Sequence, residues 1–525
     1  MDKNIRKGAF SLAAGIIILP AACSHGNKPQ DAGKQLNILY IMSDDHSFQT
    51  VGAYGCGLME TPNIDRLADS GIVFTNSFVA NSISAPSRAC LLTGKHSHKN
   101  GMTDNSRIFD GGQQTFPKLL RNAGYETALI GKWHLTSEPT GFDYWNILVG
   151  QGEYYNPVFI DNGKRRVIPG YATEITTDLA LEWLDSRKDA DRPFCLLLHH
   201  KAPHRTWMPD LQDLGAFDGE DIPLPENFHD DYSGRPAAAA QEMEIGRHMD
   251  VVYDLKMADG EMEIHTDTGL EEYGRAMYAR LAPEQKAAWD AYYGPIIKAF
   301  KADSLEGDEL AEWKYRRYMA DYMSVIRSLD RNIGRVLDYL QESGLWENTV
   351  VIYTSDQGFY MGEHGWFDKR FMYEESFRTP LLVYYPGGFR GEVDALVQNI
   401  DHAPTFLEIA GASVPEDIQG ESYLPFLRTG SEGRGERWRK SLYYHFYEYP
   451  GEHAVRRHYG VRTEWYKLIH FYGDIDSWEL YDLRNDPSEM HNLYEDRSYR
   501  RIRKKLHREL ARLQELYDDT CIIEP

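Results

Sequence analysis

Continuous apolar runs that end in polar residues are the strongest pattern along this chain. They occupy residues 37–43, 127–130, 194–198 and 349–354. Runs without alternation between apolar and polar positions are typical of strands buried on both faces of a sheet. Between them, apolar residues recur at helical spacing, in segments at 115–123, 176–186 and about 309–342. This alternation predicts an α/β fold around a large, mixed but mostly parallel sheet.

Two segments depart from this alternation. Residues 207 to about 308 are acidic, with amphipathic pieces and no strand pattern, which predicts a helical insertion. After about residue 430, short aromatic strands at 442–447 and 466–472 precede a charged helix at about 496–518. We therefore expect a main domain at 36–430 that contains the insertion at 207–308, and a smaller C-terminal α/β subdomain at 431–525.

The N-terminus has the pattern of an export signal. Basic residues precede an apolar run at residues 9–22, which is shorter than the about 20 residues that span a bilayer. Small residues before Cys23 resemble a bacterial lipobox, although Pro20 is unusual there and leaves cleavage without lipidation as the alternative. The prediction is a signal peptide at 1–22, a lipid on Cys23 and a polar tether at 23–35. Such an anchor would place the protein in the periplasm or on the outer-membrane surface of a Gram-negative bacterium.

Composition restricts the function classes. The 525 residues include 57 Lys and Arg against 80 Asp and Glu, a formal net charge of −23. A chain this acidic is not expected to bind nucleic acid, because polyanion binding draws on Lys and Arg to displace counterions. The five cysteines are scattered along the chain, so they form no disulfide framework.

Acidic and amide side chains follow two of the predicted strands. Asp44 and Asp45 end the first run, and Asp356 and Gln357 follow the run at 349–354. Carboxyl ends of parallel strands meet at one edge of a sheet, where ligands bind. Carboxylate and amide oxygens are the ligands that calcium prefers. Asp also caps turns and helices routinely, but acids brought this close would repel one another without a cation, so the pattern favours a metal site.

Basic residues lie at similar positions, just past strand ends or in loops. They are Lys132, His134, His204 and Lys369. Each alone is more often a solvated charge or a hydrogen-bonded histidine. Together they could hold an oxyanion and protonate a leaving group.

A serine and an arginine mark the start of a further helix. Pro86 fixes a helix start, where backbone amides can face an anion. Arg88 would lie one turn after Ser84 on the same side. By itself this pattern indicates only that a helix begins here.

Taken together, these motifs resemble the formylglycine-dependent (type I) sulfatases of the alkaline phosphatase superfamily. The resemblance covers essentially the whole mature chain, and the motifs occur in the family's order: Asp44-Asp45, Ser84-Ala-Pro-Ser-Arg88 with Leu92-Thr93-Gly94, Gly131-Lys-Trp-His134, Lys201-Ala-Pro-His204, Thr354-Ser-Asp-Gln-Gly358 followed by Lys369, and Tyr481-Asp-Leu-Arg-Asn-Asp-Pro487. Ser84 replaces the family's cysteine, as in the serine subtype of bacteria. Gln357 stands where many members have Asn or His. The resemblance implies an alkaline-phosphatase-like sandwich.

The resemblance also implies roles for these residues. A serine-type maturase would oxidise Ser84 to formylglycine (3-oxoalanine), whose hydrate supplies the nucleophile. Calcium would be held by Asp44, Asp45, Asp356, Gln357 and the modified Ser84. The charge of the sulfuryl group would be spread over Arg88, Lys132 and Lys369. His204 would protonate the leaving sugar oxygen, and His134 would help to expel sulfate.

The substrate prediction rests on the residues beside Lys369. Asp368 and Arg370 resemble the corresponding segment of N-acetylglucosamine-6-sulfatases, which implies that they bind O4 of a terminal glucosamine. His453, in an aromatic stretch of the C-terminal subdomain, would close the pocket. We therefore expect exo-acting hydrolysis of 6-O-sulfate from terminal N-acetylglucosamine of heparan-type or mucin-type glycans, with the sulfated glycan as partner.

Other functions remain open at this point. Within the family, the enzyme could act on uronate 2-O-sulfate or galactosamine 6-O-sulfate. A phosphatase or phosphodiesterase of the same superfamily would need a second set of metal ligands, which no motif supplies. If Ser84 stayed unmodified, the chain would bind sulfated glycans without turnover.

Overall fold

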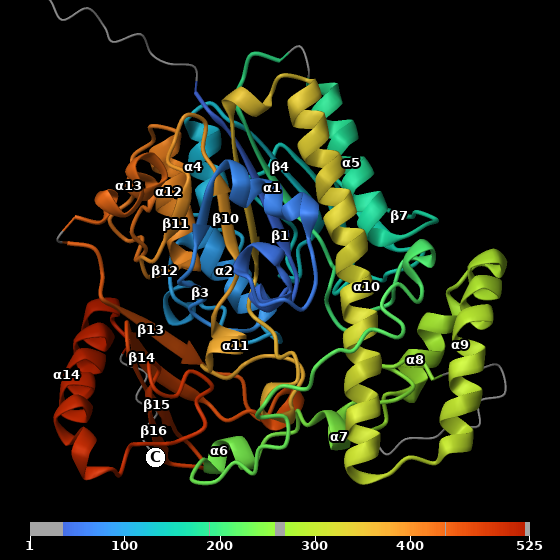
Figure 1. The fold of residues 1–525 in the computed structure, drawn as a ribbon. Coiled ribbons are helices and arrows are strands. Elements are labelled where there is room, and N and C mark those ends of the chain that lie inside the picture. Colours follow the sequence, from blue (N-terminus) through green and yellow to red (C-terminus); the bar gives the residue numbers. More distant parts are fainter. Residues whose placement is uncertain (1–34, 188–189, 258–267, 436, 520–525) are drawn as a thin grey trace, which may run out of the picture. The chain divides into compact units, whose positions relative to one another are not determined.

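The central strands of the main sheet are the four that the apolar runs predict. They are β1 (Asn37–Ser43), β4 (Glu126–Lys132), β8 (Phe194–His199) and β9 (Thr349–Ser355), and they pair in parallel in the order β9-β1-β8-β4. The computed structural model describes residues 35–187, 190–257, 268–435 and 437–519 (Figure 1). The predicted signal peptide, Cys23 and most of the tether lie outside these residues.

Shorter strands extend this sheet on both sides to a total of ten. Beyond β9 follow β10 (Leu381–Tyr384), β2 (Ile72–Phe74) and β11 (Gly391–Val393); beyond β4 follow β5 (Tyr144–Leu148), β6 (Val158–Asp161) and β7 (Lys164–Val167). β10, β6 and β7 run antiparallel to their neighbours, so the sheet is mixed. A small pair, β3 (Ser77–Phe78) and β12 (Val397–Gln398), is separate.

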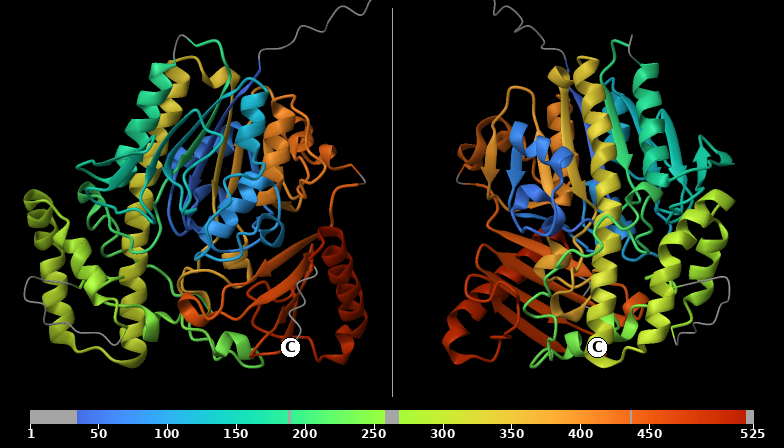
Figure 2. Two further views of the ribbon diagram at one scale, coloured as in Figure 1. Left: turned by 180° about the vertical axis from the view of Figure 1, so that it is seen from behind. Right: turned by 45° about the vertical axis from the view of Figure 1, so that its right-hand side comes forward.

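Helices cover both faces of the sheet (Figures 1 and 2). The three predicted helices are confirmed as α4 (Phe116–Asn122), α5 (Ala172–Ser186) and α10 (Gly307–Glu342). The others around the sheet are α1 (Pro62–Ser70), α2 (Ser84–Thr93), α3 (Ser97–Asn100), α11 (Glu374–Phe377), α12 (His402–Ile409) and α13 (Leu424–Thr429). The helix expected near Pro86 begins two residues earlier, at Ser84.

Burial on both faces explains why the central strands lack alternation. Successive side chains of a strand point to opposite faces. In β1, Leu39 and Ile41 belong to the core beneath α5 and α10, whereas Ile38 and Tyr40 belong to the core beneath α4 and α12. Each position of the strand must therefore be apolar.

The described part of residues 207–308 contains helices and no strand. It holds α6 (Pro236–Ala239), α7 (Ile245–His248), α8 (Glu271–Ala279) and α9 (Pro283–Asp303). Trp289, Tyr293 and Ile297 of α9 join the same core as α10. Among the described residues, no helix is both long and apolar enough to cross a bilayer.

A second sheet follows near the C-terminus. Its antiparallel strands are β13 (Ser441–Phe446), β14 (His458–Thr463), β15 (Tyr466–Phe471) and β16 (Ser477–Asp482). Helix α14 (Arg500–Tyr517) packs Leu506, Leu510 and Leu513 against it (Figure 2). The sequence pattern predicted β13 and β15 but did not predict β14 and β16. The predicted fold class, a large mixed sheet with a smaller C-terminal α/β part, is confirmed.

Candidate active site

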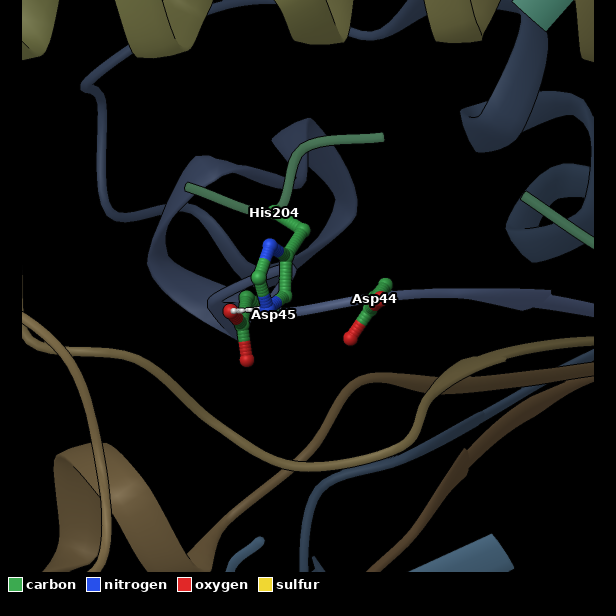
Figure 3. A group of neighbouring side chains, drawn as sticks. All are labelled: Asp44, Asp45 and His204. Carbon is green, nitrogen blue, oxygen red and sulfur yellow. Dashed lines mark ion pairs between the residues drawn. The ribbon is translucent and has the colours of Figure 1, made fainter. Parts of the chain in front are cut away.

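The predicted acids and bases meet at the carboxyl edge of the central strands. Asp44 and Asp45 follow β1, Asp356 and Gln357 follow β9, and Lys132 is the last residue of β4. Because β9, β1, β8 and β4 are neighbours, these ends lie side by side. All five side chains are buried. Figure 3 shows the imidazole of His204, from the loop after β8, beside Asp45 and near Asp44.

Ser84 lies among these acids at the first position of α2. Its hydroxyl donates to Asp44 Oδ1 at 3.3 Å and accepts from Gln357 Nε2 at 3.3 Å. One turn later, Arg88 donates from Nε and Nη2 to Asp356 Oδ2, at 3.1 and 2.8 Å. Ser84 and Arg88 share a side of the helix, as their four-residue spacing requires.

Two lysines neutralise the paired aspartates. The Lys132 ammonium pairs with Asp44, and Lys369 Nζ lies 2.7 Å from Asp45 Oδ2. His204 Nε2 lies 3.8 Å from the same oxygen of Asp45. Removing one member of such a buried pair leaves an unpaired charge and costs about 3–5 kcal/mol.

Burial and these neighbours displace the pKa values of the acids. Burial by itself raises the pKa of Asp44, but Lys132 and the other nearby cations hold it well below its usual range. Burial raises the pKa of Asp45. Burial, assisted by the charge of Asp44, raises the pKa of Asp356 to about 7. Asp45 and Asp356 therefore ionise more readily when a further positive charge is present.

The oxygen atoms at this edge fit a calcium ion. Gln357 Nε2 donates to Asp45 Oδ1 at 2.5 Å, while its Oε1 is buried and has no hydrogen-bond partner among the described residues. A free amide oxygen beside carboxylates is suited to a hard cation. Single ligand atoms of Asp44, Asp45 and His204 also lie within 4.8 Å of one another, but the imidazole nitrogen is a poorer calcium ligand than oxygen.

Of the two predicted histidines, His204 is buried and His134 half-buried, and both are neutral. Burial and the nearby Lys132 hold the pKa of His134 and of His204 well below the usual range. His204 Nδ1 donates to the carbonyl oxygen of Arg205 at 2.6 Å, so Nε2 faces Asp45 without its own proton. His134 Nδ1 is buried and has no hydrogen-bond partner within the described part of the chain.

The predicted sugar-binding residues form one network. The Arg370 guanidinium pairs with Asp368, and His453 Nε2 lies 3.1 Å from Asp368 Oδ2. Arg370 also donates from Nη2 to Glu452 Oε2 at 3.2 Å. Although burial alone raises the pKa of Asp368, Arg370, Lys369 and His453 hold it well below its usual range. Asp368 is therefore ionised and accepts hydrogen bonds only.

A pocket of about 340 Å³ lies above this site. Its wall includes five predicted residues: Ser84, His204, Asp368, Lys369 and Arg370. Its wall also includes residues that the sequence analysis did not select, among them Asn105, Lys201, Arg205, Tyr273, Arg280 and Glu452. His453 is not part of the wall, but its Nε2 contacts the carboxylate of Asp368, which is part of it. Two of the residues that were not selected had an earlier signal: Lys201 belongs to the quoted Lys-Ala-Pro-His motif, and Glu452 directly precedes the predicted His453.

This fold and site define a sulfuric ester hydrolase. The sulfatase family model matches residues 36–412, and the model of the N-sulphoglucosamine sulphohydrolase C-terminal region matches residues 362–516. The chain belongs to the sulfatase family, as its motifs predicted.

The chain is also similar to individual proteins of this family. The chain is 48% identical over 513 residues to N-acetylglucosamine-6-O-sulfatase of Bacteroides thetaiotaomicron, which covers 96% of this chain and 91% of that protein. A solved structure of a protein in complex with its substrate, D-glucosamine-2-N,6-O-disulfate, superposes with a TM-score of 0.89 at 48% identity and covers 93% and 99% of the two chains. A putative sulfatase from Bacteroides fragilis, at 22% identity, shares the fold with a TM-score of 0.69 over 94% and 98% of the chains.

Proposed function

We propose that this enzyme is an exo-acting carbohydrate sulfatase that removes the 6-O-sulfate of terminal N-acetylglucosamine in heparan-type or mucin-type glycans. The observation that carries the proposal is the Asp368–Arg370 pair, which lines the same pocket as Ser84 and Lys369. The names of the relatives, an N-acetylglucosamine-6-O-sulfatase and a protein that binds a 6-O-sulfated glucosamine, support it.

The pair suits one sugar hydroxyl. Asp368 offers a carboxylate, and Arg370 Nε is buried with no hydrogen-bond partner among the described residues. An acceptor and a free donor side by side can bind both the hydrogen and the oxygen of O4. Their position beside Lys369 supports an arrangement in which this hydroxyl lies next to the sulfate ester of the same ring. A pocket of about 340 Å³ fits a chain end, which is why we expect exo action.

We propose calcium as the metal, held by Asp44, Asp45, Asp356, Gln357 and the modified Ser84. When bound, it would supply a positive charge for a sulfate oxygen and for the nucleophilic oxygen. Oxidation of Ser84 to formylglycine by a serine-type maturase would provide that oxygen as a hydrated aldehyde. A sulfated serine has no easy way to release its sulfate, which explains why the hydroxyl alone is insufficient.

The chain's own cations would stabilise the transferring group. Lys132, Arg88 and Lys369 lie around Asp44, Asp45 and Asp356, so their positive charges surround the place where negative charge develops. Fixed charges in a site that excludes water need no reorganisation during the reaction.

We assign the proton transfers to His204 and His134. The Nδ1–H of His204 is held by the Arg205 carbonyl, so His204 would act as an acid once Nε2 has taken up a proton from water, and it would then give this proton to the leaving sugar oxygen. His134 Nδ1 has no partner among the described residues and can accept a proton when sulfate is released.

A substrate panel tests the proposal. The enzyme, produced with a serine-type maturase, is offered 6-sulfo-N-acetylglucosamine, 6-sulfo-N-acetylgalactosamine, a 2-O-sulfated uronate disaccharide and p-nitrophenyl phosphate. We expect the first to give the highest kcat/KM. The two amino sugars differ only at O4, so equal rates on them would remove the Asp368–Arg370 argument. Preference for the uronate or the phosphate would overturn the assignment.

We also propose that Cys23 carries a lipid and anchors the enzyme in the periplasm or on the outer-membrane surface. The apolar run at 9–22 and the polar residues at 24–35 support this anchor. Fractionation of cells that produce Cys23→Ala should move the enzyme from the membrane to the soluble fraction. Continued membrane association of that variant would contradict the lipid anchor.

A further inference from the structure

Two cations in the wall of the active-site pocket have no acidic partner among the residues that the structure describes. Lys201 is only 6% exposed, and its Nζ contacts the Arg205 carbonyl at 3.5 Å and the Tyr154 ring at 4.8 Å from the centroid. Arg280 donates from Nη2 to the Asn156 carbonyl at 2.9 Å, and its Nε is buried with no hydrogen-bond partner in the described part of the chain. Within the described residues, neither side chain makes an ion pair.

The two cations lie on one wall of the pocket. Both contact the segment 154–156, Lys201 through the Tyr154 ring and Arg280 through the Asn156 carbonyl. Arg280 directly follows α8, so the insertion contributes this part of the wall. Glu153 also lines the pocket and its charge acts to raise the pKa of Lys201, but it forms no ion pair with either cation among the described residues.

The other cations of the wall are already neutralised. Arg205 donates to Asp254 at 2.6 and 3.0 Å and to Glu452 at 2.6 Å. Arg370 pairs with Asp368, and Lys369 with Asp45. Lys201 and Arg280 thus differ from their neighbours in having positive charge left for a ligand.

A buried ammonium without a counter-charge is costly. Burial lowers the pKa of Lys201 to about 8, which is the expected effect of this cost. This free-energy cost is offset when an anionic group of the ligand enters the pocket and pairs with the cation.

We propose that Lys201 and Arg280 form a second anion subsite, which accepts a sulfate or carboxylate of the glycan other than the ester that is hydrolysed. This inference rests on the proposed function. Two groups have the required chemistry: the 2-N-sulfate of the same glucosamine, and the carboxylate of a uronate in the next position. The ligand of the similar solved structure, D-glucosamine-2-N,6-O-disulfate, carries a second sulfate of this kind.

Kinetics on three substrates test the subsite. They are 6-sulfo-N-acetylglucosamine, glucosamine-2-N,6-O-disulfate, and 6-sulfo-N-acetylglucosamine linked to a uronate. The variants are Lys201→Met and Arg280→Met. The control is Lys286→Met on α9, whose ammonium lies over the Tyr278 ring and outside the pocket wall.

Each subsite variant should lose about tenfold or more in kcat/KM on the substrate whose second anion is bound, as expected for a lost charge-assisted hydrogen bond. The loss on the monosulfated sugar should be much smaller, and the control should match the parent. Selective loss on the disulfate identifies the N-sulfate, and selective loss on the uronate identifies the carboxylate. Equal losses on all three substrates, or no loss on any, would overturn the subsite.

A binding measurement separates this inference from the proposed function. Calorimetry compares glucosamine-2-N-sulfate and a uronate-linked N-acetylglucosamine with N-acetylglucosamine, all without the 6-O-sulfate. The parent should bind one anionic sugar more tightly, and Lys201→Met should remove that difference. If the parent hydrolysed no 6-O-sulfated glucosamine, the proposed function would fail while this comparison still decided the subsite. Equal affinities of the parent for the three sugars would refute the subsite.

Discussion

Asp368→Asn gives the sharpest test of how the sugar is selected. The substitution keeps the shape of the side chain but removes the negative charge that Arg370 and His453 share. The backbone N–H of Lys369 can still donate to the amide oxygen of the new Asn, as it does to Asp368 Oδ1 at 2.8 Å. The local backbone is therefore expected to stay in place, while the acceptor for the O4 hydroxyl weakens.

The expected loss follows from the charge on the acceptor. A hydrogen bond to a charged group contributes about 1.5–3 kcal/mol, and each 1.4 kcal/mol is about a factor of ten. The kcat/KM for 6-sulfo-N-acetylglucosamine should thus fall by about 10–150-fold. The galacto sugar places O4 on the other side of the ring, so its rate should fall much less. Discrimination between the two sugars should shrink by about the same factor.

The assay compares kcat/KM for both sugars in the parent, in Asp368→Asn and in Asp221→Asn. Asp221 is an exposed aspartate of the insertion and controls for loss of surface charge. Asp368 also lies 3.8 Å from the Lys369 ammonium. Equal losses on the two sugars would show that Asp368 acts only by holding Lys369, and would refute the O4 argument.

Three further predictions concern the metal, the nucleophile and the buried charges. Asp44→Ala should lose turnover while keeping the circular dichroism spectrum of the parent. Exhaustive chelation should inactivate the parent until calcium is added back, and full activity after chelation would contradict the calcium assignment. Ser84→Ala should be inactive. Mass spectrometry of the parent should find the Ser84 peptide lighter by the two hydrogen atoms that are lost when the alcohol becomes an aldehyde. An active enzyme with an unmodified Ser84 peptide would contradict the formylglycine proposal. Burial raises the pKa of Glu479 to about 7, so the folded chain keeps this proton to a higher pH than the unfolded chain does, and stability falls as pH rises from about 4.5 to 7. Glu479→Gln should therefore be more stable than the parent at pH 8, by up to about 3 kcal/mol, and should gain less stability at pH 5. Equal gains at both pH values, measured by thermal unfolding, would contradict the raised pKa of Glu479.

The candidate catalytic residues could be located from the sequence because the hydrophobic pattern shows where a buried strand ends. Asp44, Lys132 and Asp356 each stand at such an end, and parallel pairing brings the ends together. The contacts between them, such as the pairing of Lys132 with Asp44, join residues far apart in the chain. Local pattern alone contains no such information, so the partners became known only from the structure.

The C-terminal sheet shows where pattern fails. β13 and β15 are aromatic and were predicted, whereas β14 contains Gly460 and Arg462 and was not predicted. Its fit depends on long-range contacts: Gly460 packs against the backbone of β15, and Arg462 donates to Glu374 at 3.1 Å. Tertiary contacts of this kind override local strand preference.

The residues that we propose for specificity lie in the parts of the chain that the sequence pattern describes least. Glu452, from the C-terminal subdomain, holds both Arg370 and Arg205, and Arg280 enters the pocket from the end of α8. An amphipathic helix in the sequence shows which side is apolar, but not that its end faces a pocket. Because these residues belong to an insertion and a subdomain outside the strand ends, they can change without disturbing the acids and lysines at the sheet edge. The sulfate-transfer chemistry and the choice of sugar are therefore expected to respond to separate substitutions, as the Asp44 and Asp368 variants will show.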